Sequence, residues 1–228
     1  FGGYEYTPYE VYMKALYEYF KDDLGGDIPK ETHTAVELAE FQEDAVRKAR
    51  QILARYDGVM IADSVGLGKT WIGKRLLEDY GYFQRRQVLV IAPASLREMW
   101  EGELRSANIA GAVITQESMG QVDFDPFAFG GADAILVDES HKFQNQASQR
   151  YEALEQVIMA NGGRGKAGER KKIILLTATP HNGRPESFAS LVRMLDPTVL
   201  PPRKTDYTRD DIAHLFVRRF KADVRDEI

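Results

Sequence analysis

The sequence predicts an α/β domain with a mainly parallel central sheet and helices on both faces, and three observations carry this prediction. Short, continuously apolar segments alternate with amphipathic segments of helical periodicity. A glycine-containing loop that ends in Lys69-Thr70 joins the first of these apolar segments to a helix, and a later one ends in Asp138 and Glu139. Strands buried on both faces are apolar throughout, and parallel strands need helical crossovers, so the alternation indicates a sheet between two helical layers.

The individual elements follow from local patterns. Apolar runs predict strands at 59–62, 88–92, 112–115, 134–137 and 172–176. Apolar residues at helical spacing predict helices at 9–20, 35–56, 69–80, 95–106 and 148–160. Breaks at Gly25-Gly26 and Pro201-Pro202 suggest three regions: a helical N-terminal extension at 1–33, the α/β domain at 34–200 and a charged helical tail at 201–228.

The composition bounds the class of protein. The chain has 228 residues, 43% of them hydrophobic and 29% charged, which fits one large soluble domain with small appendages. The absence of cysteine excludes disulfides and thiolate zinc sites, and the four histidines are too scattered to suggest a metal cluster. A net charge of -5 argues against a uniformly basic nucleic-acid binder but allows a local basic face. No apolar run approaches the roughly 20 residues of a membrane span, so a cytoplasmic location without a membrane partner is expected.

The loop at 63–70, Asp-Ser-Val-Gly-Leu-Gly-Lys-Thr, has the strand-loop-helix context of a phosphate-binding loop. Gly66 and Gly68 allow backbone N–H groups to face phosphate oxygens at the positive end of the next helix. Lys69 is predicted to pair with the β and γ phosphates and Thr70 to supply a hydroxyl ligand to Mg²⁺. Asp63 departs from the general pattern, which has glycine at that position.

The adjacent carboxylates Asp138 and Glu139 follow an apolar strand about seventy residues after this loop. This order is what a Mg²⁺-dependent nucleotide hydrolase needs. Asp138 would hold the metal, and Glu139 would orient and deprotonate the attacking water.

A third block, Thr-Ala-Thr-Pro at 177–180, completes an ordered set of motifs over about 34–224. With it, the chain resembles the first RecA-like lobe of a superfamily 2 helicase, specifically the bacterial or archaeal branch of the Snf2-type double-stranded DNA translocases. Ser64 replaces a glutamate of the family's phosphate-binding loop, and Ser140 replaces the alanine of its DEAH box. The region at 34–200 would thus be ATP-binding lobe 1, and 201–228 would lead toward a second lobe.

The resemblance implies roles for further residues. Gln42 would read the adenine edge with Phe41 near the base, and the triphosphate would be held by Gly66, Leu67, Gly68, Lys69 and Thr70. His141, Thr177 and Thr179 would couple the nucleotide state to the nucleic-acid track. Ser95, Arg97 and Ser118 would contact nucleic acid. Alternatives stay open: Gln42 as an exposed helical position, His141 as a structural hydrogen-bonding residue, and Ser95 as a helix N-cap followed by a solvated Arg97.

The resemblance implies an ATP hydrolase with ATP and Mg²⁺ as cofactors, double-stranded DNA as partner and a nucleoid-associated location. Catalytic arginines would come from a second RecA-like lobe, in the same polypeptide or on a partner chain, so this lobe alone should be inactive or very slow. The alternatives are an RNA helicase lobe of superfamily 2 and a nucleotide-gated protein-interaction module. A separate hypothesis gives the basic residues of 164–172 contacts to a DNA backbone; the alternative is a solvated connector.

Overall fold

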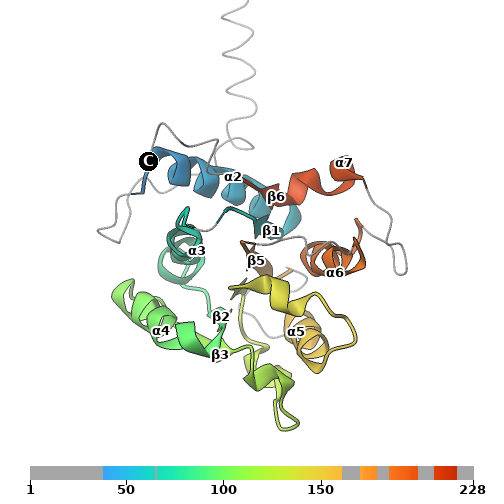
Figure 1. Cartoon of the computed structure of the whole chain (residues 1–228). Coiled ribbons are helices and arrows are strands. Elements are labelled where there is room, and N and C mark those ends of the chain that lie inside the picture. The colour runs from blue at the N-terminus through green and yellow to red at the C-terminus, as the bar shows by residue number, and fades with distance from the viewer. Residues whose placement is uncertain (1–37, 65, 161–169, 179–184, 200–207, 220–228) are drawn as a thin grey trace, which may run out of the picture. The chain divides into compact units, whose positions relative to one another are not determined.

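The computed structural model describes residues 38–64, 66–160, 170–178, 185–199 and 208–219 (Figure 1). They build a six-stranded parallel sheet in the order β3-β2-β4-β5-β1-β6. The strands are β1 Gly58–Ile61, β2 Val88–Ala92, β3 Gly111–Thr115, β4 Ala134–Val137, β5 Lys172–Leu176 and β6 Phe216–Val217. The helices are α2 Glu40–Tyr56, α3 Lys69–Glu78, α4 Arg97–Ser106, α5 Gln149–Met159, α6 Pro185–Leu195 and α7 Arg209–Ile212.

Two apolar layers cover the two faces of the sheet, which confirms the predicted α/β architecture. Alternate strand residues such as Ile61, Val90 and Leu136 pack against α2, α3 and α4. Their neighbours, including Met60 and Ile135, pack on the opposite face with α5 and α6. Figure 1 shows α3 and α4 on one side of the sheet and α5 and α6 on the other.

Gly73 sets how closely α3 approaches the sheet. A Cβ atom at this position would lie 2.8 Å from Leu136 Cδ1 and 2.9 Å from Leu176 Cδ1. Both leucines are fully buried on β4 and β5, so they have little room to move. The missing side chain therefore lets the helix that follows the phosphate-binding loop lie directly on the strand that carries the paired carboxylates.

Several boundaries differ from the sequence-based expectation for local reasons. α2 begins at Glu40, five residues later than expected, because Gln42 reaches back to the Ala39 N–H and closes the helix start there. A π-helical turn, Asp79–Phe83, follows α3. The segment predicted to be helical from 95 starts as a 3-10 turn, Ala94–Leu96, before α4.

Two elements were missed by the sequence analysis. One is α6, and the other is β6, which lies within the expected helical tail at 201–228. The described part of that tail contains α7 and also β6, which pairs with β1 through Met60↔Phe216 and Ile61↔Val217. A strand of two residues has no detectable alternation, so only its partner β1 reveals it. The N-terminal extension at 1–33 lies outside the described residues.

Candidate nucleotide-binding site

The predicted phosphate-binding and carboxylate residues meet at one edge of the sheet. The loop 63–68 follows β1, Asp138 and Glu139 follow β4, and Thr177 follows β5, which lies between those two strands. Because all strands are parallel, their carboxyl ends share this edge, which is where open α/β sheets bind ligands.

The loop has the backbone of an anion-binding turn. Gly66 and Gly68 adopt φ angles of 88° and 76°, in the left-handed region that favours glycine. A Cβ atom at Gly68 would lie 2.2 Å from Gln42 Nε2, so any other residue there would displace the Gln42 carboxamide. No side chain caps α3 and its first turn carries no acidic residue, which leaves the positive helix end available to phosphate.

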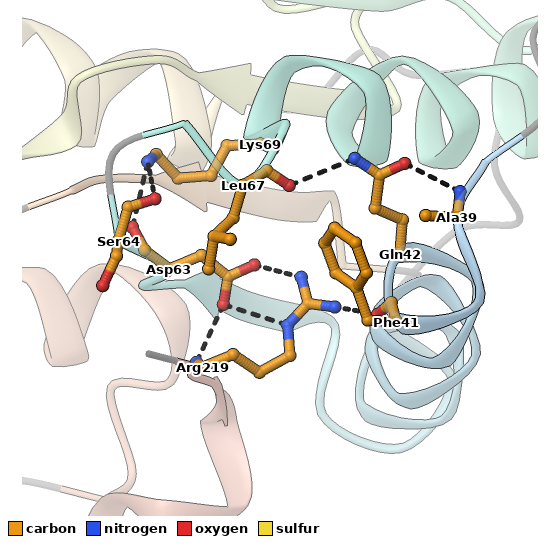
Figure 2. A network of polar contacts seen from close by, with 8 residues as sticks. All are labelled: Ala39, Phe41, Gln42, Asp63, Ser64, Leu67, Lys69 and Arg219. Carbon is orange, nitrogen blue, oxygen red and sulfur yellow. Dashed lines mark hydrogen bonds and ion pairs between the residues drawn. The ribbon is translucent and has the colours of Figure 1, made fainter. Parts of the chain in front are cut away.

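Lys69 closes the loop on itself. Its Nζ donates to the backbone carbonyl oxygens of Asp63 at 2.9 Å and Ser64 at 3.3 Å (Figure 2). Burial lowers the pKa of the Lys69 ammonium, and the charges of Asp63, Glu139 and Asp138 oppose that effect. The group is therefore a partly desolvated cation whose present partners are neutral carbonyls, which a triphosphate can replace with charged oxygens.

Gln42 links the start of α2 to the loop. Its Oε1 accepts from Ala39 N at 3.1 Å and its Nε2 donates to Leu67 O at 3.2 Å (Figure 2). The alternative of an exposed, uninvolved helical position is therefore wrong. A carboxamide has a second N–H and a second lone pair, so Gln42 keeps the capacity to pair with an adenine edge.

Phe41 supports the loop. Its ring is buried and forms a small apolar cluster with Leu67, and the Arg219 guanidinium lies 5.3 Å from the ring centroid. These neighbours lie beside the predicted phosphate-binding loop, and the expected position of Phe41 near the base stays a prediction. What they indicate is packing under the phosphate-binding loop.

Arg219 is a site residue that the sequence analysis missed. Its side chain pairs with the Asp63 carboxylate and donates to the Phe41 carbonyl oxygen, and its backbone N–H donates to Asp63 Oδ1 at 2.9 Å (Figure 2). The signal was present in the sequence: a carboxylate occupies position 63 where phosphate-binding loops generally have glycine, and such a group calls for a cation.

Asp138 is held in place from three sides. Trp100 Nε1 donates to its Oδ2 at 2.9 Å, and the Glu139 N–H donates to its Oδ1, also at 2.9 Å. Gln116 Nε2 donates to its carbonyl oxygen at 2.5 Å. Glu139 has a left-handed backbone, with φ 46°, and its Oε2 lies 3.2 Å from His141 Nδ1. The fixed carboxylate suits a metal ligand, whereas the half-exposed Glu139 suits a residue that meets water.

The remaining predicted ligands lie at the same edge. Thr70 is the second residue of α3 and is half-buried, as a hydroxyl ligand beside the phosphates requires. Thr177 is fully buried and its N–H donates to Ile61 O at 3.1 Å, while Thr179 lies outside the described residues. Across the described ranges, no three His, Asp or Glu side chains cluster around a possible metal position. One hydroxyl and one carboxylate fit Mg²⁺, which keeps waters and phosphate oxygens as its other ligands.

The candidate nucleic-acid residues follow β2 and β3, so they lie at the same carboxyl edge but toward the β3 end of the sheet, whereas the phosphate-binding loop follows β1. Ser95 is exposed and does not cap α4, so the N-cap alternative is wrong. Arg97 is exposed and bonds to Glu101 at 2.8 Å, and Ser118 Oγ donates to Thr115 O at 2.7 Å. The two loops touch through the Ala94 N–H, which donates to Glu117 Oε2 at 3.0 Å.

The basic residues at 170–172 serve the fold, which argues against the proposed DNA-backbone contact. Lys171 Nζ donates to Gly130 O at 2.7 Å and Val157 O at 3.0 Å, and Lys172 Nζ pairs with Asp57 Oδ1 at 2.5 Å. Lys172 opens β5, so this group lies at the amino ends of the strands, opposite the phosphate-binding loop. The other part of the basic segment, 164–169, lies outside the described residues.

Known proteins resemble the chain in sequence and in fold. No family model matches it. It is 28% identical over 167 residues to the uncharacterized ATP-dependent helicase YqhH of Bacillus subtilis, covering 65% of this chain and 28% of that protein. It is 26% identical over 185 residues to the SWI/SNF-related matrix-associated actin-dependent regulator of chromatin subfamily A-like protein 1 of Xenopus laevis. This match covers 72% of this chain and 18% of that protein.

Among solved structures, the Sulfolobus solfataricus SWI2/SNF2 ATPase core in complex with dsDNA matches 88% of this chain and 48% of that one, with a TM-score of 0.68 and 19% identity. The chain thus spans less than a third of the two curated relatives and about half of this core.

The fold is RecA-like, with the predicted phosphate-binding loop and paired carboxylates at the carboxyl edge of its parallel sheet. The relatives confirm the resemblance to Snf2-type members of helicase superfamily 2, and one of them is named an ATP-dependent helicase. None of the helices in the described ranges has the length and apolar character that a membrane crossing needs.

Proposed function

We propose that this chain is the ATP-binding first lobe of a Snf2-type translocase that moves along double-stranded DNA. The observation that carries the proposal is the convergence of Lys69, Thr70 and Asp138 at the carboxyl edge of a parallel sheet, with Gln42 beside the loop. An anion-binding turn, a buried carboxylate and an adenine-competent carboxamide are the parts that a Mg²⁺-nucleotide site needs.

Each residue has one task in this proposal. The loop amides and Lys69 bind the β and γ phosphates, and Gln42 pairs with the adenine edge. Thr70 and Asp138 hold Mg²⁺, which supplies charge neutralisation between the phosphates when bound. Glu139 orients the attacking water and takes its proton. Arginines of a second RecA-like lobe complete the site. Catalytic arginines of this kind typically raise the hydrolysis rate by ~10³- to 10⁵-fold.

Double-stranded DNA is the proposed track because the related Sulfolobus core is described in complex with dsDNA and the Xenopus relative is named a regulator of chromatin. The loops after β2 and β3, with Arg97 exposed, offer the contact surface beside the site. A nucleoid location would follow from such a substrate. Stimulation of ATP hydrolysis by RNA instead of duplex DNA would favour the superfamily 2 RNA helicase alternative.

Nucleotide binding by the 228-residue chain tests the proposal. Lys69→Ala should weaken Mg²⁺-ATP binding by about 10- to 100-fold, because it removes a charge-assisted contact worth ~1.5 to 3 kcal/mol. Glu139→Gln should bind normally, because the residue acts on water and not on the nucleotide. Titration calorimetry measures both. Equal ATP affinity in wild type and Lys69→Ala would contradict the assignment of the loop.

Hydrolysis by the same chain tests the second half of the proposal. We expect it to bind ATP but to turn over far more slowly than the complete two-lobe motor, with or without duplex DNA. A phosphate-release assay measures the rate. DNA-stimulated turnover of several per second from this chain alone would refute the need for a second lobe.

A further inference from the structure

The contacts of Arg219 join three parts of the chain that are far apart in sequence. The residue follows β6, and it meets Asp63 at the end of β1 and Phe41 in the first turn of α2. Its carbonyl oxygen also accepts from the Ser64 N–H at 3.3 Å. The Arg219 side chain is 14% exposed and that of Asp63 is 0% exposed, so the pair is almost fully withdrawn from water.

We propose that Arg219 is a positioning residue of the nucleotide site, which fixes the phosphate-binding loop against the Gln42 end of α2 and thereby sets the preference for adenine over guanine. The inference rests on the proposed function. It gives Arg219, which lies in the segment 216–221 and to which the sequence analysis gave no role at the nucleotide site, a specific effect on which nucleotide is bound.

The planar fork of arginine is needed for this arrangement. Nε and Nη2 face the Asp63 carboxylate while Nη1 donates to the Phe41 carbonyl oxygen, so one rigid group holds two elements at once. A lysine would keep the charge opposite Asp63 but presents a single ammonium on a flexible stem. The pair also explains why Asp63 stands where other phosphate-binding loops have glycine: the carboxylate receives Arg219.

The Arg219 contacts affect base recognition because Gln42 directly follows Phe41 in α2. Gln42 contacts the loop through one hydrogen bond, from Nε2 to Leu67 O at 3.2 Å. Arg219 supplies a second link between the same two elements, because it ties Phe41 to Asp63. The carboxamide can distinguish adenine from guanine only if its donor and acceptor stay fixed relative to the phosphates. Loss of the second link leaves only the Gln42 hydrogen bond and the Phe41–Leu67 contact between the first turn of α2 and the loop, so this turn can shift more easily.

The test compares Arg219→Lys with Arg50→Lys in the 228-residue chain. Arg50 is a matched control: it lies on α2 and makes a two-pronged pair with Asp79, at 2.7 and 2.8 Å, with side chains 18% and 13% exposed. It lies about 13 Å further along the helix than Phe41 at 1.5 Å per residue. Both substitutions keep the charge and remove the fork.

We measure dissociation constants for Mg²⁺-ATP and Mg²⁺-GTP, and amide hydrogen exchange at 40–45 and 58–64 without nucleotide. Arg219→Lys should reduce the ATP-over-GTP ratio by about tenfold, since a well-placed two-point base contact is worth about that factor. It should also raise exchange in both segments. Arg50→Lys should leave the ratio and the exchange at 58–64 unchanged.

An unchanged ratio in a folded Arg219→Lys chain, or an equal fall in both variants, would overturn the inference. If Arg219→Lys fails to fold, the neutral double variant Asp63→Asn/Arg219→Gln takes its place under the same criteria. A wild-type chain that binds neither nucleotide would instead count against the proposed function. The hydrogen-exchange comparison then still decides whether Arg219 holds the two elements together.

Discussion

At the scale of single residues, hydrogen bonds fix the Asp138 carboxylate before any nucleotide arrives. Asp138 is 6% exposed and both of its carboxylate oxygens accept a hydrogen bond, one of them from the buried Trp100 indole. A ligand whose orientation is fixed in this way loses little freedom when a metal binds. Trp100 therefore supports the site from α4, the helix that also carries the candidate nucleic-acid residue Arg97.

Trp100→Phe should destabilise the fold and raise the Mg²⁺ concentration needed for half-maximal ATP binding. The substitution leaves Asp138 Oδ2 without its donor and opens a cavity, which together should cost about 2 to 4 kcal/mol of unfolding free energy. Urea denaturation and a Mg²⁺ titration measure the two effects. Trp71→Phe is the control for stability, because Trp71, the other of the two tryptophans, is exposed. An unchanged Mg²⁺ requirement would mean that the indole only fills space.

The pH dependence of ATP binding should report Lys69. Burial lowers the pKa of its ammonium from the ordinary lysine value of 10.5. Between the lowered and the ordinary value, the free folded chain has lost this proton while the unfolded chain keeps it. The Lys69 contribution to stability therefore rises with pH in this window. The triphosphate favours the charged form, so ATP affinity should fall with rising pH through the same window, and binding should take up a proton.

Calorimetry in buffers of different ionisation enthalpy measures that proton uptake. Lys69→Arg should bind without it, because arginine stays charged. The pKa of Lys171 is also lowered by burial, but its contacts to Gly130 and Val157 lie away from the loop, so Lys171→Met should leave the uptake unchanged. Equal proton uptake in wild type and Lys69→Arg would show that a group other than Lys69 takes up the proton.

At the scale of elements, close packing of α3 on the sheet brings the phosphate-binding loop and the carboxylate strand to one place. Gly73 permits this approach, and Gly68 leaves room for the Gln42 carboxamide against the loop. Glycine is unfavourable within a helix by about 1 kcal/mol relative to alanine, so its presence at 73 reflects a packing need.

Gly73→Ala and Gly102→Ala should change stability in opposite directions. At 73 the new methyl group meets two buried leucine side chains, and overpacking of about 1 to 3 kcal/mol should exceed the gain in helix propensity. At 102, on α4, a Cβ would have no neighbour within 4 Å, so the same substitution should stabilise by roughly 0.5 to 1 kcal/mol. Chemical denaturation measures both, and stabilisation by Gly73→Ala would contradict the packing argument.

At the scale of the whole molecule, different groups of residues lie at the carboxyl edge and at the amino edge of the sheet. The carboxyl edge carries the loop, the carboxylates and the candidate nucleic-acid loops. The amino edge carries basic residues that bond to backbone carbonyls and to Asp57. Within the described residues, Lys171 and Lys172 therefore serve the fold at the amino edge.

Lys172→Met should lower stability but leave DNA binding and its salt dependence unchanged, because Lys172 bonds to Leu53 O and Asp57. Arg97→Ala should leave stability nearly unchanged. It should make the slope of log DNA affinity against log salt concentration shallower by about one, the amount expected for one lost phosphate contact. Both are measured by DNA titration at several salt concentrations in a protein that contains the complete motor. A weaker dependence of DNA affinity on salt concentration in Lys172→Met would show that the amino edge contacts DNA.

The sequence by itself determined the mainly parallel sheet, the positions of five of its strands along the chain and the residues of the loop and carboxylate motifs. Each of these is encoded locally, in apolar runs, glycines and side chains a few positions apart. Only the tertiary structure decided that Arg219 completes the loop, that Trp100 holds Asp138 and that Lys171 and Lys172 serve the fold. Arg219 and Asp63 lie 156 positions apart, and no local pattern can show which buried charge will find which partner once the chain has folded.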